Sequence, residues 1–286
     1  MMVTSNNQPC VVCREINPDN FRIWFDGYVK IYKCLSCGAV AQYSGPGSQT
    51  IVTDYSNSYN LNFLKEGKLF RRPEKENGLI DIINKITKYT SGKNLLDIGC
   101  GDGQFIHLCK KNNFQCKGIE LDTNLSKYAS QITGCQIINM PYHKSMFPES
   151  SFDVITLIQV LEHLTDPTEI LKIAHYHLKE HGIIIIEIPS IQSPNFLAYR
   201  LTKLKFFVRP PHGVIKSHYG YYNPSTLLKL TTKCDYHTVE LITGRWKYKK
   251  SKLQKLFGSF IDPLLGALKI GGILYIGTKK GFRCVK

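Results

Sequence analysis

The sequence predicts an α/β fold in which a mostly parallel, doubly wound sheet follows a small cysteine-rich module. Three observations support this. Apolar strands alternate with helical segments from about residue 91 onward. A glycine-rich turn follows the first of these strands, and two Cys-x-x-Cys pairs come before all of them. We therefore expect a cysteine module over 1–45, a linker and lead-in helix over 46–90, and the main domain over 91–286.

The cysteine module predicts a structural zinc ribbon. Its two Cys-x-x-Cys pairs are separated by 20 residues and comprise Cys10, Cys13, Cys34 and Cys37. A two-residue gap lets two thiolates on one tight turn bind a single ion, and the second pair completes a tetrahedron. Short strands are expected at 21–25 and 28–32. A module this small buries little apolar surface, so a Zn²⁺ ion would stabilise it; four unrelated free cysteines are the alternative.

The main domain shows the alternation of a parallel sheet covered on both faces. Strands are expected at 94–98, 117–121, 136–138, 152–158 and 183–188. Helices are expected at 61–89, 103–112, 123–131, 167–180 and 224–233. The fourth of these helices has clear signals: Asp166 as N-cap, Pro167 at the first position, Glu169 as the capping-box partner, and a stop at Gly182. Segments 236–243 and 272–279 are candidates for a closing antiparallel pair.

Charge is distributed very unevenly along the chain. The 286 residues carry a formal net charge of +15, and residues 191–286 hold 18 Lys and Arg against three acids, which accounts for all of it. The densest run is 245–252. Such a field favours an anionic partner: a phosphate-bearing small molecule, nucleic acid or a membrane surface. An ordinary solvated, lysine-rich surface is the alternative interpretation.

Membrane spans and secretion signals are not indicated. The chain has no run of about 18 apolar residues, and its first ten residues lack a basic-then-apolar pattern. We expect a cytoplasmic protein, with peripheral membrane contact left open. Ten cysteines in such a compartment are not expected to form a disulfide framework.

The glycine-rich turn and an acidic residue indicate a nucleoside-binding site. The first strand runs into the pattern Asp-x-Gly-x-Gly-x-Gly over 97–103, where glycines let the backbone approach a ligand at the carboxyl end of the sheet. Glu120 ends the second strand, 17 residues after Gly103. A carboxylate there can accept hydrogen bonds from both ribose hydroxyls. The pattern differs from the Gly-x-Gly-x-x-Gly of dinucleotide-binding proteins.

These motifs resemble those of class I S-adenosylmethionine-dependent methyltransferases. The resemblance rests on Asp97-x-Gly99-x-Gly101, Glu120, Phe152-Asp153 and the run Val-Leu-Glu-His-Leu-Thr-Asp-Pro at 160–167. Together with the cysteine pairs, it is closest to the branch with an N-terminal zinc-binding module, met in bacterial sugar, surface-polysaccharide and natural-product pathways. The resemblance covers almost the whole chain and implies a Rossmann-like sheet of seven strands.

The resemblance also implies roles for individual residues at the cofactor site. Gly99 and Gly101 would pass under the methionine part, Glu120 would hold the ribose, and Leu121 would pack on the adenine. Met140 would lie near the adenine edge, and Gln159 would close over the methionine moiety. The expected cofactor-binding set is Asp97, Gly99, Cys100, Gly101, Glu120, Leu121, Met140 and Gln159. An ordinary exposed acid at Glu120, and simple packing at Met140 and Gln159, are the alternatives.

Three residues are candidates for the chemistry. A hydroxyl acceptor must lose a proton, most often to His, Asp or Glu. His218 is the expected general base, because related sequences carry a similar His-plus-aromatic stretch after the fifth strand. His163 is expected at the cofactor edge, and Glu162–His163 could instead help bind a divalent metal, although one pair supplies too few ligands to claim it. Tyr222, with Tyr219 and Tyr221, could stack on an acceptor or pack in the core.

The resemblance implies methyl transfer from S-adenosylmethionine. The expected reaction is O-methylation of a sugar hydroxyl on a nucleotide-sugar, surface glycan or natural product, with a small-molecule or glycan acceptor that carries negative charge. The insert at about 190–223 is basic and aromatic, unlike that of the relatives, and leaves the acceptor open. Alternatives are C-methylation of a nucleotide-sugar, RNA methylation, which lacks a recognisable RNA-binding signature here, and a non-catalytic zinc-ribbon binding protein.

Overall fold

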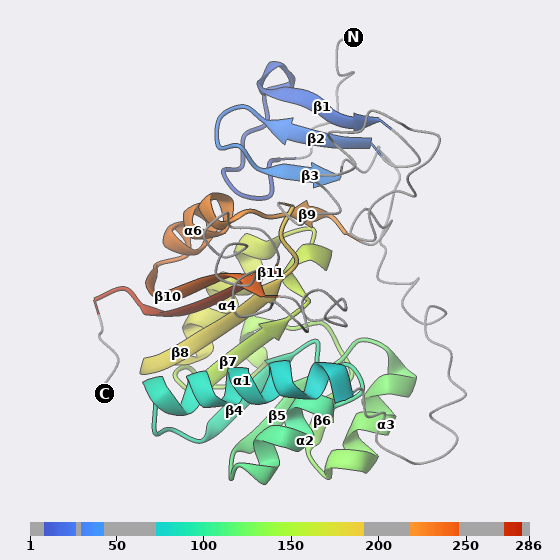
Figure 1. Ribbon diagram of the computed structural model, residues 1–286, viewed down its shortest axis with the longest axis vertical. Helices are drawn as coiled ribbons and strands as arrows, with labels where there is room; N and C mark the ends of the chain where they lie inside the picture. The colour runs from blue at the N-terminus through green and yellow to red at the C-terminus, as the bar shows by residue number, and fades with distance from the viewer. Residues whose placement is uncertain (1–8, 27–29, 43–72, 192–217, 246–271, 282–286) are drawn as a thin grey trace, which may run out of the picture.

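The computed structural model describes residues 9–26, 30–42, 73–191, 218–245 and 272–281, which form two sheets stacked along the long axis (Figure 1). A four-stranded sheet lies at the N-terminal end, and a seven-stranded sheet with its helices fills the rest. No helix in these described ranges is both long and apolar enough to cross a membrane. The linker over 46–72, most of the basic insert and the basic run after Arg245 lie outside the described residues.

The large sheet has the strand order β10-β11-β8-β7-β4-β5-β6. Its strands are β4 (Asn94–Ile98), β5 (Gln115–Ile119), β6 (Gln136–Ile138), β7 (Phe152–Ile158), β8 (Leu178–Ile188), β10 (Tyr236–Arg245) and β11 (Gly272–Lys279). The five strands from β6 to β8 pair in parallel, whereas β11 lies antiparallel between β8 and β10. The expected mostly parallel sheet of seven strands and its antiparallel closing pair are therefore confirmed.

Helices cover both faces of this sheet (Figure 1). They are α1 (Pro73–Tyr89), α2 (Gln104–Lys111), α3 (Thr123–Thr133), α4 (Pro167–His177) and α6 (Pro224–Lys233). Neighbouring strand residues point to opposite sides: Leu95 packs in one cluster with α1 and α2, and Leu96 packs in another with α4 and α6. The central strands are apolar on both faces because both faces are buried in this way.

The small sheet joins the cysteine module to a distant part of the chain. Strands β1 (Phe21–Asp26), β2 (Lys30–Cys34) and β3 (Val40–Gln42) form an antiparallel meander. Its fourth strand is β9 (Gly220–Tyr221), where Val40 pairs with Tyr221 and Ala41 with Gly220. One buried cluster runs without a break from the cysteine module through α4 and α6 to the large sheet. The module is therefore packed into the main domain, although the sequence pattern presents it as a separate region.

Several expected boundaries were wrong. In the small sheet, the strand expected at 28–32 continues to Cys34. Helix α4 ends at His177, not near Glu180, because Leu178 takes an extended backbone conformation and pairs with Phe152 of β7. Strand pairing here overrides the local helical pattern, and β8 begins before Gly182. Strand β5 spans Gln115–Ile119, so Glu120 follows the strand and does not end it. The Asp166 N-cap is confirmed, since its side chain accepts from the backbone N of Glu169.

Candidate functional site

The glycine loop lies at the carboxyl end of β4. Its three glycines have positive φ angles, +70° at Gly99, +56° at Gly101 and +78° at Gly103, a region that side chains disfavour. The backbone N–H of Gly99 donates to the carbonyl of Ile119 at 2.8 Å, which fixes the loop against the end of β5. A Cβ on Gly99 would lie 2.5 Å from Cγ2 of Val160, so the loop also packs tightly against the segment after β7.

Glu120 ties this loop to the start of α3. Its Oε2 accepts from the N–H of Gly101 and its Oε1 from the N–H of Asp122, both at 2.8 Å. Burial raises the pKa of the Glu120 carboxyl above its usual value, and the two backbone donors oppose that rise. Each carboxylate oxygen can accept more than one hydrogen bond, so Glu120 keeps acceptor capacity for the hydroxyls of a ribose.

Asp97 and Cys100 lie beneath the loop. The Asp97 carboxylate is 2% exposed and accepts from Thr156 Oγ1 at 2.6 Å. Burial raises the pKa of Asp97 to about 7, and the Thr156 hydroxyl only partly opposes this. Cys100 packs its thiol against Ile106 and Ala129, and burial raises its pKa. These two side chains support the loop from below, and the backbone at Cys100 belongs to the loop itself.

Two apolar side chains beside the loop are unusually open. Leu121 is 40% exposed and Met140 is 46% exposed, although most large hydrophobic side chains here are buried. Asn139 holds their segments together, since its Nδ2 donates to the carbonyls of Glu120 and Leu121 at 2.8 Å. An apolar surface next to a carboxylate that can accept from ribose hydroxyls suits an adenine ring. The residues present therefore fit the nucleoside part of S-adenosylmethionine.

The segment after β7 closes the other side of the loop. Gln159 has φ +59°, uncommon for a residue with a side chain, and its backbone N donates to the carbonyl of Glu187 at 2.7 Å. This turn leads into the short helix η6 (Leu161–His163). The close approach of Gly99 and Val160 places η6 next to the glycine loop.

The structure brings Glu162, His163 and His218 together. Their ligand atoms all lie within 4.8 Å of one another, and the two imidazole rings meet edge to face with centroids 4.7 Å apart. Glu162 is 1% exposed and His218 is 8% exposed. The sequence singled out both histidines separately, but their contact was not predicted. It could have been found from topology, because His163 follows β7, His218 comes after β8, and these strands are neighbours.

The segment that carries His218 is held on three sides. Tyr219 N donates to the carbonyl of Glu162 at 2.8 Å, and the N–H of Gln42 in β3 donates to the carbonyl of Tyr219 at 2.8 Å. Ile191 N donates to the carbonyl of Tyr222 at 3.0 Å, beyond the end of β8. The Tyr222 side chain is 1% exposed and packs in the core cluster, as the packing interpretation expects. Burial raises the pKa of its hydroxyl.

The four cysteines of the N-terminal module come together as the sequence predicts. Their sulfur atoms all lie within 4.8 Å of one another, with Cys10–Cys37 at 3.5 Å and Cys13–Cys34 at 3.6 Å. Sulfur atoms at the corners of a zinc tetrahedron lie about 3.8 Å apart. The pKa of Cys10 is lowered to about 5, chiefly because the Cys37 thiol can donate to its thiolate. The donor set therefore fits a closed structural zinc site.

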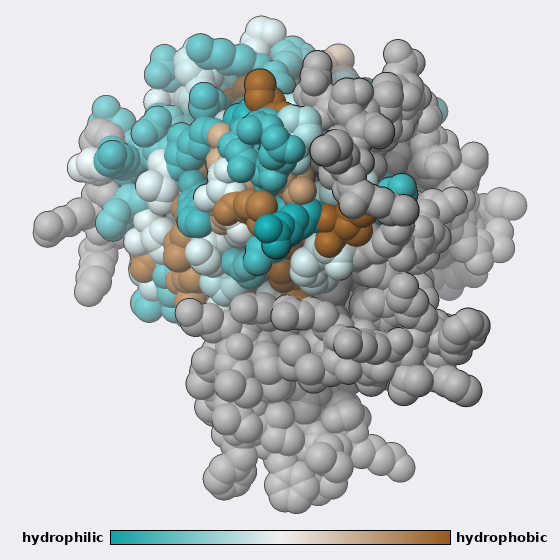
Figure 2. All heavy atoms as spheres, turned by 90° about the horizontal axis from the view of Figure 1, so that it is seen from above, coloured by the Kyte–Doolittle hydropathy of each residue, from teal (hydrophilic) through white to brown (hydrophobic). Residues whose placement is uncertain are grey.

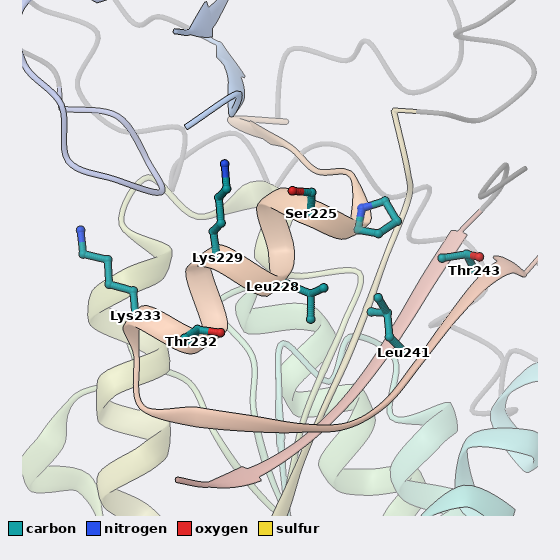
Figure 3. Close-up of a pocket in the computed structure, with 8 residues that line it drawn as sticks. Ser225, Leu228, Lys229, Thr232, Lys233, Leu241 and Thr243 are labelled. Atoms are coloured by element: carbon teal, nitrogen blue, oxygen red, sulfur yellow. The ribbon is translucent and has the colours of Figure 1, made fainter. Parts of the chain in front are cut away.

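Two lysines of α6 fasten this module to the main domain (Figure 3). Lys229 Nζ donates to the carbonyl of Cys37 at 2.8 Å, and Lys233 Nζ donates to that of Val12 at 3.3 Å. Beside them, α6 and β10 line a groove of about 740 Å³ whose walls include Leu228 and Leu241. Sequence reasoning missed both lysine contacts, because nothing in the local pattern marks a lysine that binds a carbonyl about 200 residues away.

The end of the molecule that carries the module is mainly hydrophilic among its described residues, with small hydrophobic areas between them (Figure 2). Ile16, Ile23 and Leu35 are the large hydrophobic side chains of the module with high exposure in the described ranges. Two other histidines lie two residues apart on α4 and face different directions. His177 binds the Tyr142 hydroxyl at 2.6 Å, whereas His175 meets the Tyr236 ring.

Comparison with known proteins identifies the family. A family profile described as a methyltransferase domain matches residues 70–241. The chain belongs to this family.

Curated relatives are both O- and N-methyltransferases. A ubiquinone biosynthesis O-methyltransferase of Glaesserella parasuis serovar 5 (strain SH0165) is 25% identical over 56% of this chain and 72% of its own length. Ajmaline N-methyltransferase of Rauvolfia serpentina is 31% identical, but the match spans only 28% of this chain and 30% of the relative. These relatives support the predicted methyltransferase class and leave the acceptor open.

Solved structures show the same fold. A SAM-dependent methyltransferase from Archaeoglobus fulgidus has a TM-score of 0.53 at 19% identity, over 76% of this chain and 99% of that one. Identity this low speaks for the fold alone. The expected Rossmann-like methyltransferase fold is thus confirmed.

Proposed function

We propose that this chain transfers a methyl group from S-adenosylmethionine to a hydroxyl of a sugar, on a nucleotide-sugar, a surface glycan or a natural product. The observation that carries the proposal is the meeting of His163 and His218 beside the cofactor loop. Two imidazoles at the edge of a methyl-donor site suit an acceptor that must lose a proton. A ubiquinone-pathway O-methyltransferase among the relatives agrees with this reaction type.

The cofactor would be held by the loop residues and Glu120. Gly99 and Gly101 leave room for the methionine part, Glu120 accepts from the ribose hydroxyls, and Leu121 and Met140 cover the adenine. Bound S-adenosylmethionine supplies an electrophilic methyl group on a sulfonium that is its own leaving group. The protein therefore mainly aligns the acceptor and disposes of its proton.

His218 is the residue we assign to proton removal. Its segment is held by the backbone hydrogen bonds that Tyr219, Gln42 and Ile191 donate. Its ring contacts the rings of His163 and Tyr221. As the acceptor oxygen forms its bond to the methyl carbon, the carbon–sulfur bond breaks and the proton passes to the imidazole. Buried Tyr222 packs behind this segment and is a positioning residue in the proposal.

The N-terminal module would hold a structural Zn²⁺ through Cys10, Cys13, Cys34 and Cys37. Four thiolates leave the ion no open position, so its role is to shape the module. The module in turn positions β9, which follows His218. The basic C-terminal third of the chain would attract an acceptor that carries phosphate.

Labelled methyl transfer into a host extract tests the proposal. The extract is divided into RNA, protein, and small-molecule plus glycan pools after reaction with S-adenosylmethionine carrying a labelled methyl group. We expect label in the last pool, reduced at least about a hundredfold by His218→Ala with cofactor affinity unchanged. An exposed control variant, His143→Ala, should keep full transfer. Label in the RNA pool would instead assign the C-terminal charge to nucleic-acid binding.

A further inference from the structure

We propose that Glu162, His163 and His218 bind a divalent first-row transition-metal ion, at a site distinct from the four cysteines. The inference rests on the proposed methyl transfer and changes one part of it: His218 acts as a metal ligand in place of a general base. The three residues come from two segments, η6 and the residue two before β9, and still place their ligand atoms within 4.8 Å of one another. The sequence offered only the Glu162–His163 pair, and the fold supplies the third ligand.

The geometry needs little adjustment to hold an ion. Nitrogen and oxygen ligands bind such ions at about 2.0–2.2 Å, so two ligands of one ion lie no more than about 4.4 Å apart. Side-chain movements of a few tenths of an ångström would bring the widest separation into this range. The hydrogen bond from Tyr219 N to the Glu162 carbonyl, at 2.8 Å, already joins the two segments next to the ligands.

Burial favours a cation at this place. The Glu162 side chain is 1% exposed, and a carboxylate so far from water is costly unless a positive charge or hydrogen bonds compensate. Two neutral imidazoles can either pack against each other or bind a metal ion through their ring nitrogens. The edge-to-face contact of the rings at 4.7 Å suits the first role, and the convergence of all three ligand atoms suits the second.

The ligand types indicate which ion would bind. Two imidazole nitrogens and one carboxylate make a three-ligand set that leaves coordination positions open, unlike the closed four-sulfur set of the N-terminal module. Such a set suits Zn²⁺, Mn²⁺, Fe²⁺ or Co²⁺, while the thiolates prefer Zn²⁺. Mn²⁺ is therefore a selective probe for the histidine site in protein whose cysteines already hold zinc.

The open positions define the acceptor class. An acceptor with two neighbouring oxygens, such as a vicinal diol, would bind through both of them. Coordination lowers the pKa of the hydroxyl, so its proton leaves to water before the oxygen bonds to the methyl carbon and the carbon–sulfur bond breaks. In this form of the protein His218 is a ligand, and the coordinated hydroxyl does not need it as a base.

Mn²⁺ binding to the full, zinc-containing chain tests the inference. Electron paramagnetic resonance follows the loss of the free-ion signal, with zinc content measured in parallel. We expect one Mn²⁺ per chain in the wild type and in the exposed control His143→Ala. Affinity should fall at least about tenfold in His163→Ala and in His218→Ala. His163 is only partly buried, so its variant is expected to fold even if Glu162→Gln does not.

Two results of the Mn²⁺ titration would overturn the inference. One is the lack of saturable Mn²⁺ binding in folded wild-type protein. The other is equal affinity in His143→Ala and His218→Ala. A methyl-transfer assay separates this inference from the proposed function. The protein is treated with a chelator under conditions that leave zinc on the four cysteines. Loss of methyl transfer after this treatment, restored by added Mn²⁺, supports the site. Undiminished transfer in chelated protein, together with an inactive His218→Ala, overturns the metal and leaves His218 as base. Failure to bind S-adenosylmethionine defeats the proposed function, while the Mn²⁺ titration still decides the site.

Discussion

Replacing Glu120 with Gln is the sharpest test of the cofactor site, because the structure fixes what the carboxylate does. Its two oxygens accept from the N–H groups of Gly101 and Asp122, both at 2.8 Å. Glutamine has the same shape but one carbonyl oxygen, so one N–H would face an amide NH₂. Loss of one buried acceptor costs about 1–3 kcal/mol of folding free energy. The free energy of unfolding of Glu120→Gln should fall by that amount.

Cofactor affinity should fall as well. Hydrogen bonds from the ribose hydroxyls to a charged acceptor contribute about 1.5–3 kcal/mol, and an amide oxygen without charge loses much of it. The dissociation constant for S-adenosylmethionine should therefore rise by roughly ten- to 150-fold. Isothermal titration calorimetry measures this, and urea unfolding measures stability separately.

The matched control is Glu169→Gln. Glu169 is an exposed acid in the first turn of α4, so the variant loses the same charge without touching the loop. Its affinity for the cofactor should equal that of the wild type. An unchanged dissociation constant in stably folded Glu120→Gln would refute the assignment of Glu120 to the ribose. An equal loss in both variants would point to long-range charge and not to a contact.

Two further predictions concern the zinc module and the buried acid under the loop. Cys34→Ser should release zinc and loosen β3, the strand that supports β9 next to His218. Methyl transfer should fall about tenfold or more, while calorimetry should show nearly unchanged cofactor affinity. Full activity in zinc-free protein would contradict this prediction. Burial raises the pKa of Asp97 to about 7, so the folded state binds a proton that the unfolded state releases near pH 4. Stability from this group is complete below about pH 4 and falls by up to about 1.4 kcal/mol per unit as pH rises towards 7. Asp97→Asn should remove this slope in urea unfolding between pH 5 and 8, and parallel profiles for the two proteins would show that Asp97 is ionised throughout.

The sequence predicted most of the large sheet because its signals are local. Each central strand is a short apolar run, and helix α6 matches its expected range of 224–233, with Asn223 and Thr226 forming a capping box. The boundary of α4 failed because His177 and Leu178 look helical in isolation, and only pairing with Phe152 makes the chain extended there. Local patterns contain no information about such a partner.

The candidate site likewise has parts that could be predicted from the sequence and a part that could not. The glycine loop and Glu120 could be found because their residue types and spacing are typical of a nucleoside-binding site. The four cysteines could be found because two Cys-x-x-Cys pairs have the spacing typical of a zinc site. The cluster of Glu162, His163 and His218 depends on two segments that meet only in the folded chain, so sequence reasoning named the members without joining them.

The way β9 is held explains why the cysteine module is packed into the main domain. A two-residue strand has too few hydrogen bonds to persist alone, and β9 pairs with β3 of the module. On its other side, Ser190 forms a parallel bridge with Tyr222 beyond the end of β8. The segment that carries His218 is thus held by both the large sheet and the module. Lys229 of α6 also joins the main domain to the module, because its Nζ donates to the Cys37 carbonyl. The glycine loop makes none of these contacts. Damage to the module should therefore reduce methyl transfer to the acceptor while cofactor binding is kept.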